Sequence, residues 1–160
     1  MSPAIEAFAL NARLFCQWAE SDKHDPLLAR QLLLALLQGM PELANFSAAN
    51  EREGDYARRE HNQWKADHGR FSDLPFQYYQ ETLSPCDLTD DAIGMGDLLD
   101  DFADIYGDLW HGLQALDQGD EAYAIQHWAE SYFQHWGRHA SAAVRVLDEH
   151  YRATWKPKGS

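Results

Sequence analysis

Positive charge is missing from a long internal stretch of the sequence. No Lys or Arg occurs from Phe71 to Gly137, a run of 67 residues that holds 14 of the 26 Asp and Glu. The whole chain carries a net charge of −13. Nucleic acids and anionic membrane surfaces are bound largely through Lys and Arg. We therefore expect neither as a partner, and the charge leaves a basic protein, a divalent cation or simple solubility as its purpose.

Cysteine and long apolar runs are also scarce. Cys16 and Cys86 form no Cys-x-x-Cys pair, so no zinc ribbon or redox motif is indicated. The most apolar stretch, residues 30–38, is too short to span a bilayer. The N-terminus lacks the basic and apolar regions of a signal peptide. We therefore expect a cytoplasmic protein that does not enter a membrane.

Familiar catalytic motifs are not found. The sequence has no Gly-rich phosphate loop, no Gly-x-Ser-x-Gly, no His-Glu-x-x-His and no repeated Glu-x-x-His of di-iron bundles. Asp-x-x-Asp repeats also occur in all-α pyrophosphatases that bind Mg²⁺, but those need acidic motifs on two helices. The acidic block here supplies only one such helix.

The apolar residues that are present follow helical spacing. A chain of this length predicts one domain, which we assign to residues 1–154, followed by a flexible tail at 155–160. One helix is predicted over residues 3–20, capped by Ser2. A second is predicted to begin at Pro26 and to end near Gly39, with Pro41 reinforcing the stop.

The rest of the chain also reads as helical. We expect a polar helix at about residues 46–66, an aromatic-anchored segment with one short helix at 71–94, and a helix from Gly96 or Asp97 to about 116. A final helix is predicted at about 120–153, with a bend at Gly137. No alternation typical of a β-strand is apparent. The predicted fold is an all-α, single-domain bundle of five or six helices, the last two antiparallel.

Two stripes run along the helix that begins near Asp97. Its apolar stripe repeats every three or four residues and predicts a buried face. One position earlier runs a polar seam, formed by Asp97, Asp101, Asp104, Asp108 and His111. Like charges at this spacing destabilise a helix by roughly 0.2–0.5 kcal/mol per pair. We therefore expect the inner aspartates either to be solvated or to have partners, which could be imidazole, guanidinium or a metal.

The final helix offers such partners. His127, His135 and His139 flank its apolar stripe. Antiparallel pairing through the turn at 117–119 places His135 within a turn of Asp101 and Asp104, His139 close to Asp97 and Asp101, and His127 between Asp108 and His111. Two histidines one turn apart, together with carboxylates, can hold Zn, Mn or Fe. Histidines beside an apolar face are more often held by a carboxylate or a backbone carbonyl.

These segments resemble a bacterial family known as a domain of unknown function, DUF5063. The resemblance rests on residues 100–109, Asp-Asp-Phe-Ala-Asp-Ile-Tyr-Gly-Asp-Leu, and on residues 135–139, His-Trp-Gly-Arg-His. Trp128, residues 142–147 and the pair Tyr78-Tyr79 agree with the same order. The resemblance covers the C-terminal half, implies an all-helical fold and assigns no activity.

Three hypotheses for the function stay open. In the first, the chain is a non-enzymatic binding or structural protein that needs no cofactor, and its Asp/His seam fastens the last two helices. In the second, the polar cluster holds a divalent metal, as a metal-binding bundle or a metal-dependent hydrolase. That cluster comprises Asp101, Asp104, Asp108, His135 and His139. In the third, the acidic block is an adaptor for a basic protein partner.

Overall fold

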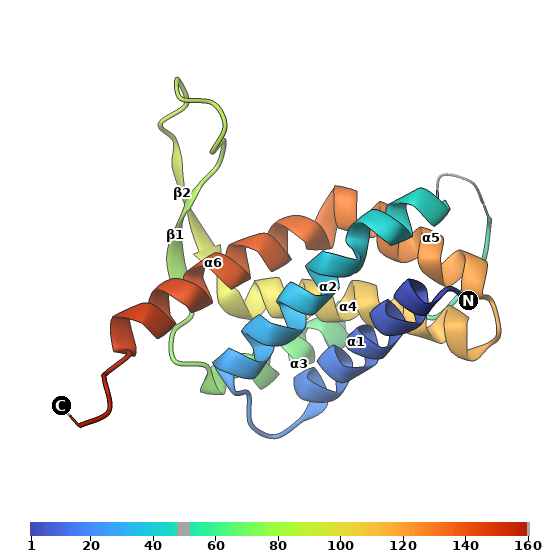
Figure 1. The fold of residues 1–160 in the computed structure, drawn as a ribbon, viewed down its shortest axis with the longest axis horizontal. Coiled ribbons are helices and arrows are strands. Elements are labelled where there is room, and N and C mark those ends of the chain that lie inside the picture. The colour runs from blue at the N-terminus through green and yellow to red at the C-terminus, as the bar shows by residue number, and fades with distance from the viewer. Residues whose placement is uncertain (48–51, 160) are drawn as a thin grey trace.

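Four helical stretches pack side by side in the computed structural model, which describes residues 1–47 and 52–159 (Figure 1). The stretches are α1 (Pro3–Glu20), α2 (Pro26–Ser47), α4 (Leu98–Asp117), and α5 (Glu121–Ser131) continued by α6 (Gly137–Thr154). The first helix packs against α2 and α4, and α2 and α4 each pack against both α5 and α6. The shorter α3 (His61–Arg70) and a 3₁₀ turn (Phe71–Asp73) lie against α4.

The two best-predicted helices begin at side-chain caps. The Ser2 hydroxyl accepts a hydrogen bond from the Ile5 N–H at 3.3 Å, and Pro3 occupies the first helical position. The Asp97 carboxylate accepts from the Leu99 N–H at 2.9 Å at the start of α4. The predicted helices at 3–20 and from Asp97 onward are therefore confirmed to within one or two residues.

The second helix does not end where the sequence suggested. It continues past Gly39 and Pro41 to Ser47. Met40 and Leu43, on the continued part, are buried in the core. Proline inside a helix removes one backbone hydrogen bond and costs about 3 kcal/mol. The burial of two large apolar side chains, worth roughly 1.5–3 kcal/mol each, offsets that cost.

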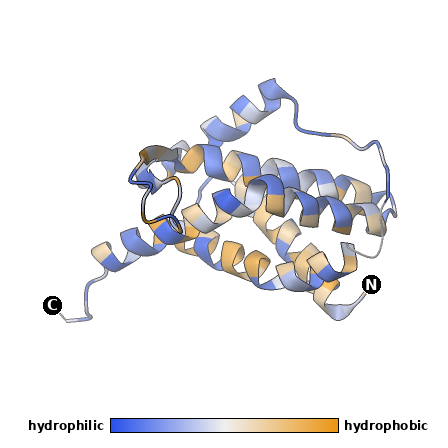
Figure 2. Ribbon diagram, turned by 90° about the horizontal axis from the view of Figure 1, so that it is seen from above, coloured by the Kyte–Doolittle hydropathy of each residue, from blue (hydrophilic) through white to orange (hydrophobic). Residues whose placement is uncertain are grey.

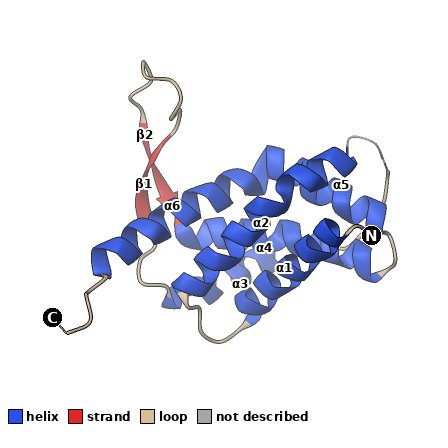
Figure 3. Cartoon of the chain, viewed as in Figure 1, coloured by secondary structure: helices blue, strands red, loops and turns tan. Residues whose placement is uncertain are grey.

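A β-hairpin interrupts the predicted all-α pattern, so the fold is predominantly rather than strictly helical. The strands β1 (Tyr78–Thr82) and β2 (Ile93–Asp97) pair antiparallel, with Tyr79 opposite Gly96 (Figure 3). The hairpin projects from the helical body beside α6 (Figure 1). Its outward side chains remain exposed, and β2 contains two glycines. Neither strand shows the apolar alternation by which a strand is recognised from sequence.

The polar segment that precedes α3 is also not the predicted helix. Residues 46–47 belong to α2, residues 48–51 lie outside the described part of the chain, and residues 52–60 follow an irregular path. Side-chain bonds fix that path: Tyr56 donates to Asp120 at 2.6 Å and Arg59 donates to Asp67 at 2.9 Å. The helix begins only at His61, where Glu60 and Gln63 form a capping box.

The predicted final helix is divided by a single π-helical turn, Tyr132–Trp136. A π turn carries one extra residue and shifts the faces of the helix on either side of it. The turn ends directly before Gly137, where a Cβ atom would lie 2.5 Å from the Tyr132 carbonyl oxygen. The interruption therefore falls at the place where the sequence predicted a bend.

Two tryptophans at the centre of the core join α4 to α5 and α6. Trp128 and Trp136 are fully buried, and the Trp128 indole N–H donates to the Leu109 carbonyl at 3.1 Å. Hydrophilic and hydrophobic residues alternate along the helices that enclose this core (Figure 2). No helix of the described residues combines the length and apolarity that crossing a membrane requires.

The contact between α4 and Trp128 predicts a strict need for glycine at position 112. A Cβ atom at Gly112 would lie 2.1 Å from the Trp128 Nε1 atom. Gly112→Ala should therefore lower the free energy of unfolding by about 1–3 kcal/mol through overpacking. Gly107→Ala on the same helix is the matched control, because its Cβ would meet only Arg59 Cγ at 3.8 Å. Urea unfolding should show Gly107→Ala unchanged or stabilised by up to about 1 kcal/mol. Equal losses in both variants would contradict this packing.

Candidate functional site

The inner aspartates of α4 face the histidines that follow α5. Asp101 is buried, whereas Asp104 and Asp108 are partly buried, and all three lie within hydrogen-bonding or ion-pair distance of an imidazole. The five residues of the predicted polar cluster therefore come together in one place, at the level of the π turn and the first turn of α6.

His135 is held between two carboxylates. Its Nδ1–H donates to Asp108 Oδ2 at 2.6 Å, and its Nε2 lies 3.6 Å from Asp104 Oδ2. The residue belongs to the π turn, and 46% of its side chain is exposed. The hydrogen bonds with Asp104 and Asp108 raise the pKa of His135 to about 10. Without a metal, this ring is therefore an imidazolium at neutral pH.

His139 repeats the same arrangement one turn further along. Its Nδ1–H donates to Asp101 Oδ1 at 2.7 Å, and its Nε2 lies 3.2 Å from Asp104 Oδ2. Only 10% of its side chain is exposed, and its ring is perpendicular to that of His135 at 5.1 Å between centroids. The Nε2 atoms of both rings thus converge on the same oxygen of Asp104.

Two aromatic side chains orient these carboxylates from outside. The Tyr79 hydroxyl donates to Asp101 Oδ2 at 2.6 Å, and the Trp64 indole N–H donates to Asp104 Oδ1 at 2.8 Å. Burial raises the pKa of Asp104, but hydrogen bonds from His135 and Trp64 outweigh that effect and hold it below the ordinary value. Sequence reasoning did not identify Trp64, because nothing in α3 indicates which of its side chains meets α4.

The pairing of the helices follows the sequence prediction only before the π turn. His127 lies where expected, with its Nε2–H donating to the Asp108 carbonyl at 3.1 Å and its ring 4.3 Å from that of His111. From the π turn onward the register differs: His135, within that turn, meets Asp104 and Asp108 rather than Asp101 and Asp104. His139 likewise meets Asp101 and Asp104 rather than Asp97 and Asp101. The partners are therefore about one turn further along α4 than predicted.

The His111–His127 pair is not part of the carboxylate cluster. Burial, together with the proximity of His111 and Arg58, lowers the pKa of His127 to about 3. Burial also lowers the pKa of His111, whose ring bonds to the Ala57 carbonyl and the Tyr123 hydroxyl. Both rings are therefore neutral, and their bonds to backbone and hydroxyl groups assign them a structural role.

Asp104, His135 and His139 together offer three ligand atoms within 4.8 Å of one another. Tetrahedral zinc with bonds of about 2.0–2.2 Å separates its ligand atoms by roughly 3.3–3.6 Å. The two Nε2 atoms lie 3.2 and 3.6 Å from Asp104 Oδ2, close to that separation. Asp100, Asp101 and His139 form a second possible set. That set would use His139 Nδ1, which already bonds to Asp101.

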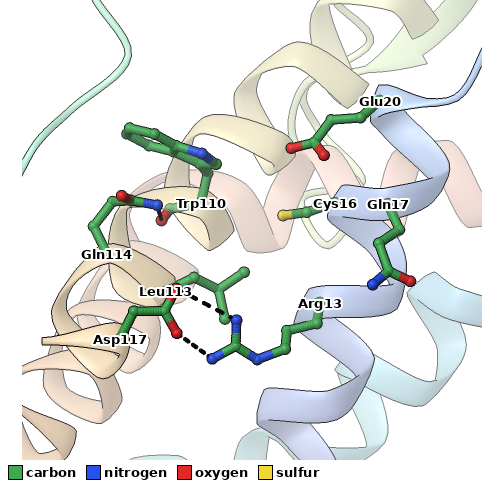
Figure 4. Close-up of a pocket in the computed structure, with 8 residues that line it drawn as sticks. All are labelled: Arg13, Cys16, Gln17, Glu20, Trp110, Leu113, Gln114 and Asp117. Carbon is green, nitrogen blue, oxygen red and sulfur yellow. Dashed lines mark hydrogen bonds and ion pairs between the residues drawn. The ribbon is translucent and has the colours of Figure 1, made fainter. Parts of the chain in front are cut away.

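A pocket of about 180 Å³ opens onto two of these ligands, Asp104 and His135. Arg58, Trp64 and Gly107 contribute to its wall. A different pocket, between α1 and α4, contains no comparable chemistry (Figure 4). There Arg13 is hydrogen-bonded to Asp117, and burial raises the pKa of the Cys16 thiol, which keeps it protonated.

Comparison with known proteins agrees with the resemblance noted in the sequence. A family described as "Domain of unknown function (DUF5063)" matches residues 70–153, which include α4, α5, α6 and the hairpin. No protein of curated function matches the chain. The crystal structure of protein BF1032 from Bacteroides fragilis is similar, with a TM-score of 0.70 at 15% identity over 99% of this chain and 97% of that one. That likeness shows the fold alone.

The raised pKa of His135 predicts a pH-dependent contribution to stability in metal-free protein. An unfolded histidine titrates near pH 6.5, whereas the folded pKa is about 10. The stabilisation is therefore fully present below about pH 6.5 and is lost as the pH rises through about 10. With chelator present, the difference in unfolding free energy between wild type and His135→Gln should be largest at pH 6 and smallest at pH 10.5. A difference that is constant or grows with pH would contradict the geometry described here.

Proposed function

The chain belongs to the DUF5063 family, whose description names no activity, and from the site itself we propose that it binds one divalent first-row transition metal such as Zn²⁺. The ligands are Asp104 Oδ2 and the Nε2 atoms of His135 and His139. One observation carries the proposal: both Nε2 atoms converge on a single carboxylate oxygen, while both Nδ1–H groups are held by other carboxylates.

This arrangement matches what zinc and similar ions require of histidine ligands. A metal-bound histidine donates its other ring N–H to a carboxylate or carbonyl, which fixes the tautomer and makes the ligand nitrogen more basic. Asp108 and Asp101 occupy these positions for His135 and His139. Tyr79 and Trp64 then bond to the remaining oxygens of Asp101 and Asp104. Each ligand is therefore oriented by a bond that does not involve the metal.

The charge of the cluster also favours a cation. Asp101, Asp104 and Asp108 face two imidazoles, and no Lys or Arg among the described residues forms an ion pair with these three carboxylates. Burial, and then the charge of Asp104, raise the pKa of the neighbouring Asp100. Negative charge is thus in excess. A dication placed between Asp104 and the two Nε2 atoms would offset this negative charge.

Metal binding corresponds to the second hypothesis drawn from the sequence and retains the fastening of the last helices from the first. The ligands come from α4, from the π turn and from the first turn of α6, so an ion bound between them would fasten α4 to α6. Three protein ligands leave a fourth position open, which is typical of catalytic rather than purely structural zinc sites. The adaptor role of the acidic block for a basic partner stays a prediction.

Calorimetric titration of metal-free protein with Zn²⁺ tests the proposal. We expect one ion per chain, because one ligand set is complete. His135→Ala and Asp104→Asn each remove a ligand and should weaken binding by more than the roughly 10–100-fold typical of outer-shell substitutions. Asp101→Asn disturbs only the orientation of His139 and should fall within that 10–100-fold range.

His61→Ala is the matched control, since this exposed histidine lies on α3 outside the cluster. Its affinity for Zn²⁺ should equal that of the wild type. Circular dichroism and urea unfolding establish that each variant is folded. Absence of stoichiometric Zn²⁺ binding to folded wild-type protein, or equal losses in the ligand variants and in His61→Ala, would reject the metal site. The seam would then be a structural fastening only.

A further inference from the structure

We propose that the pocket beside the metal ligands receives a small oxyanion, of the phosphate or phosphomonoester class, as the fourth ligand of the ion. This inference rests on the proposed metal site and names what binds there. It depends on three observations: where the pocket opens, which charged groups around it have partners among the described residues, and how the neighbours of Arg58 are held in place.

The pocket meets the metal ligands at their exposed side. Asp104 and His135 line it, whereas the more deeply buried His139 does not. An ion held by these three residues would therefore turn its fourth position toward the pocket. The volume of about 180 Å³ is below the roughly 300–1,000 Å³ typical of pockets for drug-sized ligands. The site is therefore suited to a small anion.

Almost every charged group around the pocket already has a partner. Arg59 donates to both oxygens of Asp67 at 2.9 Å and lies over the rings of Tyr106 and Trp110. Asp108 accepts from His135.

In contrast, Arg58 is exposed and forms no ion pair with any residue of 1–47 or 52–159. Among the described residues that line this pocket, Arg58 is therefore a positive charge without an ion-pair partner.

Both neighbours of Arg58 are bonded to the rest of the fold, Ala57 through its backbone carbonyl and Arg59 through its side chain. The Ala57 carbonyl accepts from His111 of α4 at 2.6 Å, and the next residue, Arg59, is bonded to Asp67 of α3. Arg58 thus lies in the wall of the pocket, and its side chain forms no ion pair with the part of the chain that the structure describes. Arginine binds phosphate oxygens through paired N–H groups, whereas a metal ion binds them directly. An oxyanion in the pocket could use both contacts.

Cobalt-substituted protein provides a direct test with inorganic phosphate as the probe. The visible absorption of bound Co²⁺ should change on addition of phosphate and reach saturation. The ³¹P resonance of phosphate should broaden because the nucleus approaches a paramagnetic ion. Arg58→Ala should weaken phosphate binding by about 10–100-fold, as expected for loss of a charge-assisted contact. Its affinity for Co²⁺ should stay within twofold of wild type.

Arg138→Ala is the control, because Arg138 is an exposed arginine of α6 that does not line this pocket. Failure of folded wild-type protein to bind Co²⁺ would reject the metal site and with it this inference. Binding of Co²⁺ with no spectral response to phosphate, or equal phosphate affinity in Arg58→Ala and wild type, would reject the oxyanion site alone. Metal analysis after desalting verifies that phosphate has not removed the ion.

Discussion

The placement of two imidazole rings between α4 and α6 depends on a pair of hydrogen bonds at Nδ1. Asp108 holds His135 and Asp101 holds His139, at 2.6 and 2.7 Å. With Nδ1 occupied, each ring can only turn Nε2 toward the space in front of Asp104. The convergence of both Nε2 atoms on one oxygen of Asp104 follows from this constraint.

The same constraint explains why an aspartate-rich helix is tolerated inside the fold. Like charges three or four residues apart would oppose one another on a solvated helix. Here the inner aspartates accept bonds from imidazole, indole and phenol groups supplied by four other elements, namely the π turn, α6, α3 and β1. The long stretch without Lys or Arg thus coincides with a place where imidazole, indole and phenol groups bond to the carboxylates.

Features that depend on residues close together in the sequence, such as helix caps and apolar spacing, could be predicted. The caps at Ser2 and Asp97, and the apolar stripe of α4, predicted two helices and the face that carries the aspartates. Features that arise from tertiary packing were missed. Helix α2 passes through Pro41 because later residues are buried, and Trp64 reaches Asp104 from a helix with no distinctive pattern. The hairpin lacks the apolar alternation typical of strands. Because of the π turn, His135 and His139 meet aspartates about one turn further along α4 than the sequence predicted.

X-ray absorption spectroscopy of the zinc-loaded protein examines the central claim most directly. The account predicts zinc surrounded only by nitrogen and oxygen at about 2.0–2.2 Å, with outer-shell scattering from two imidazole rings. His139→Gln should retain at most one imidazole contribution. A spectrum with sulfur in the first shell, or with no imidazole scattering, would show that His135 and His139 do not share a metal ion with Asp104.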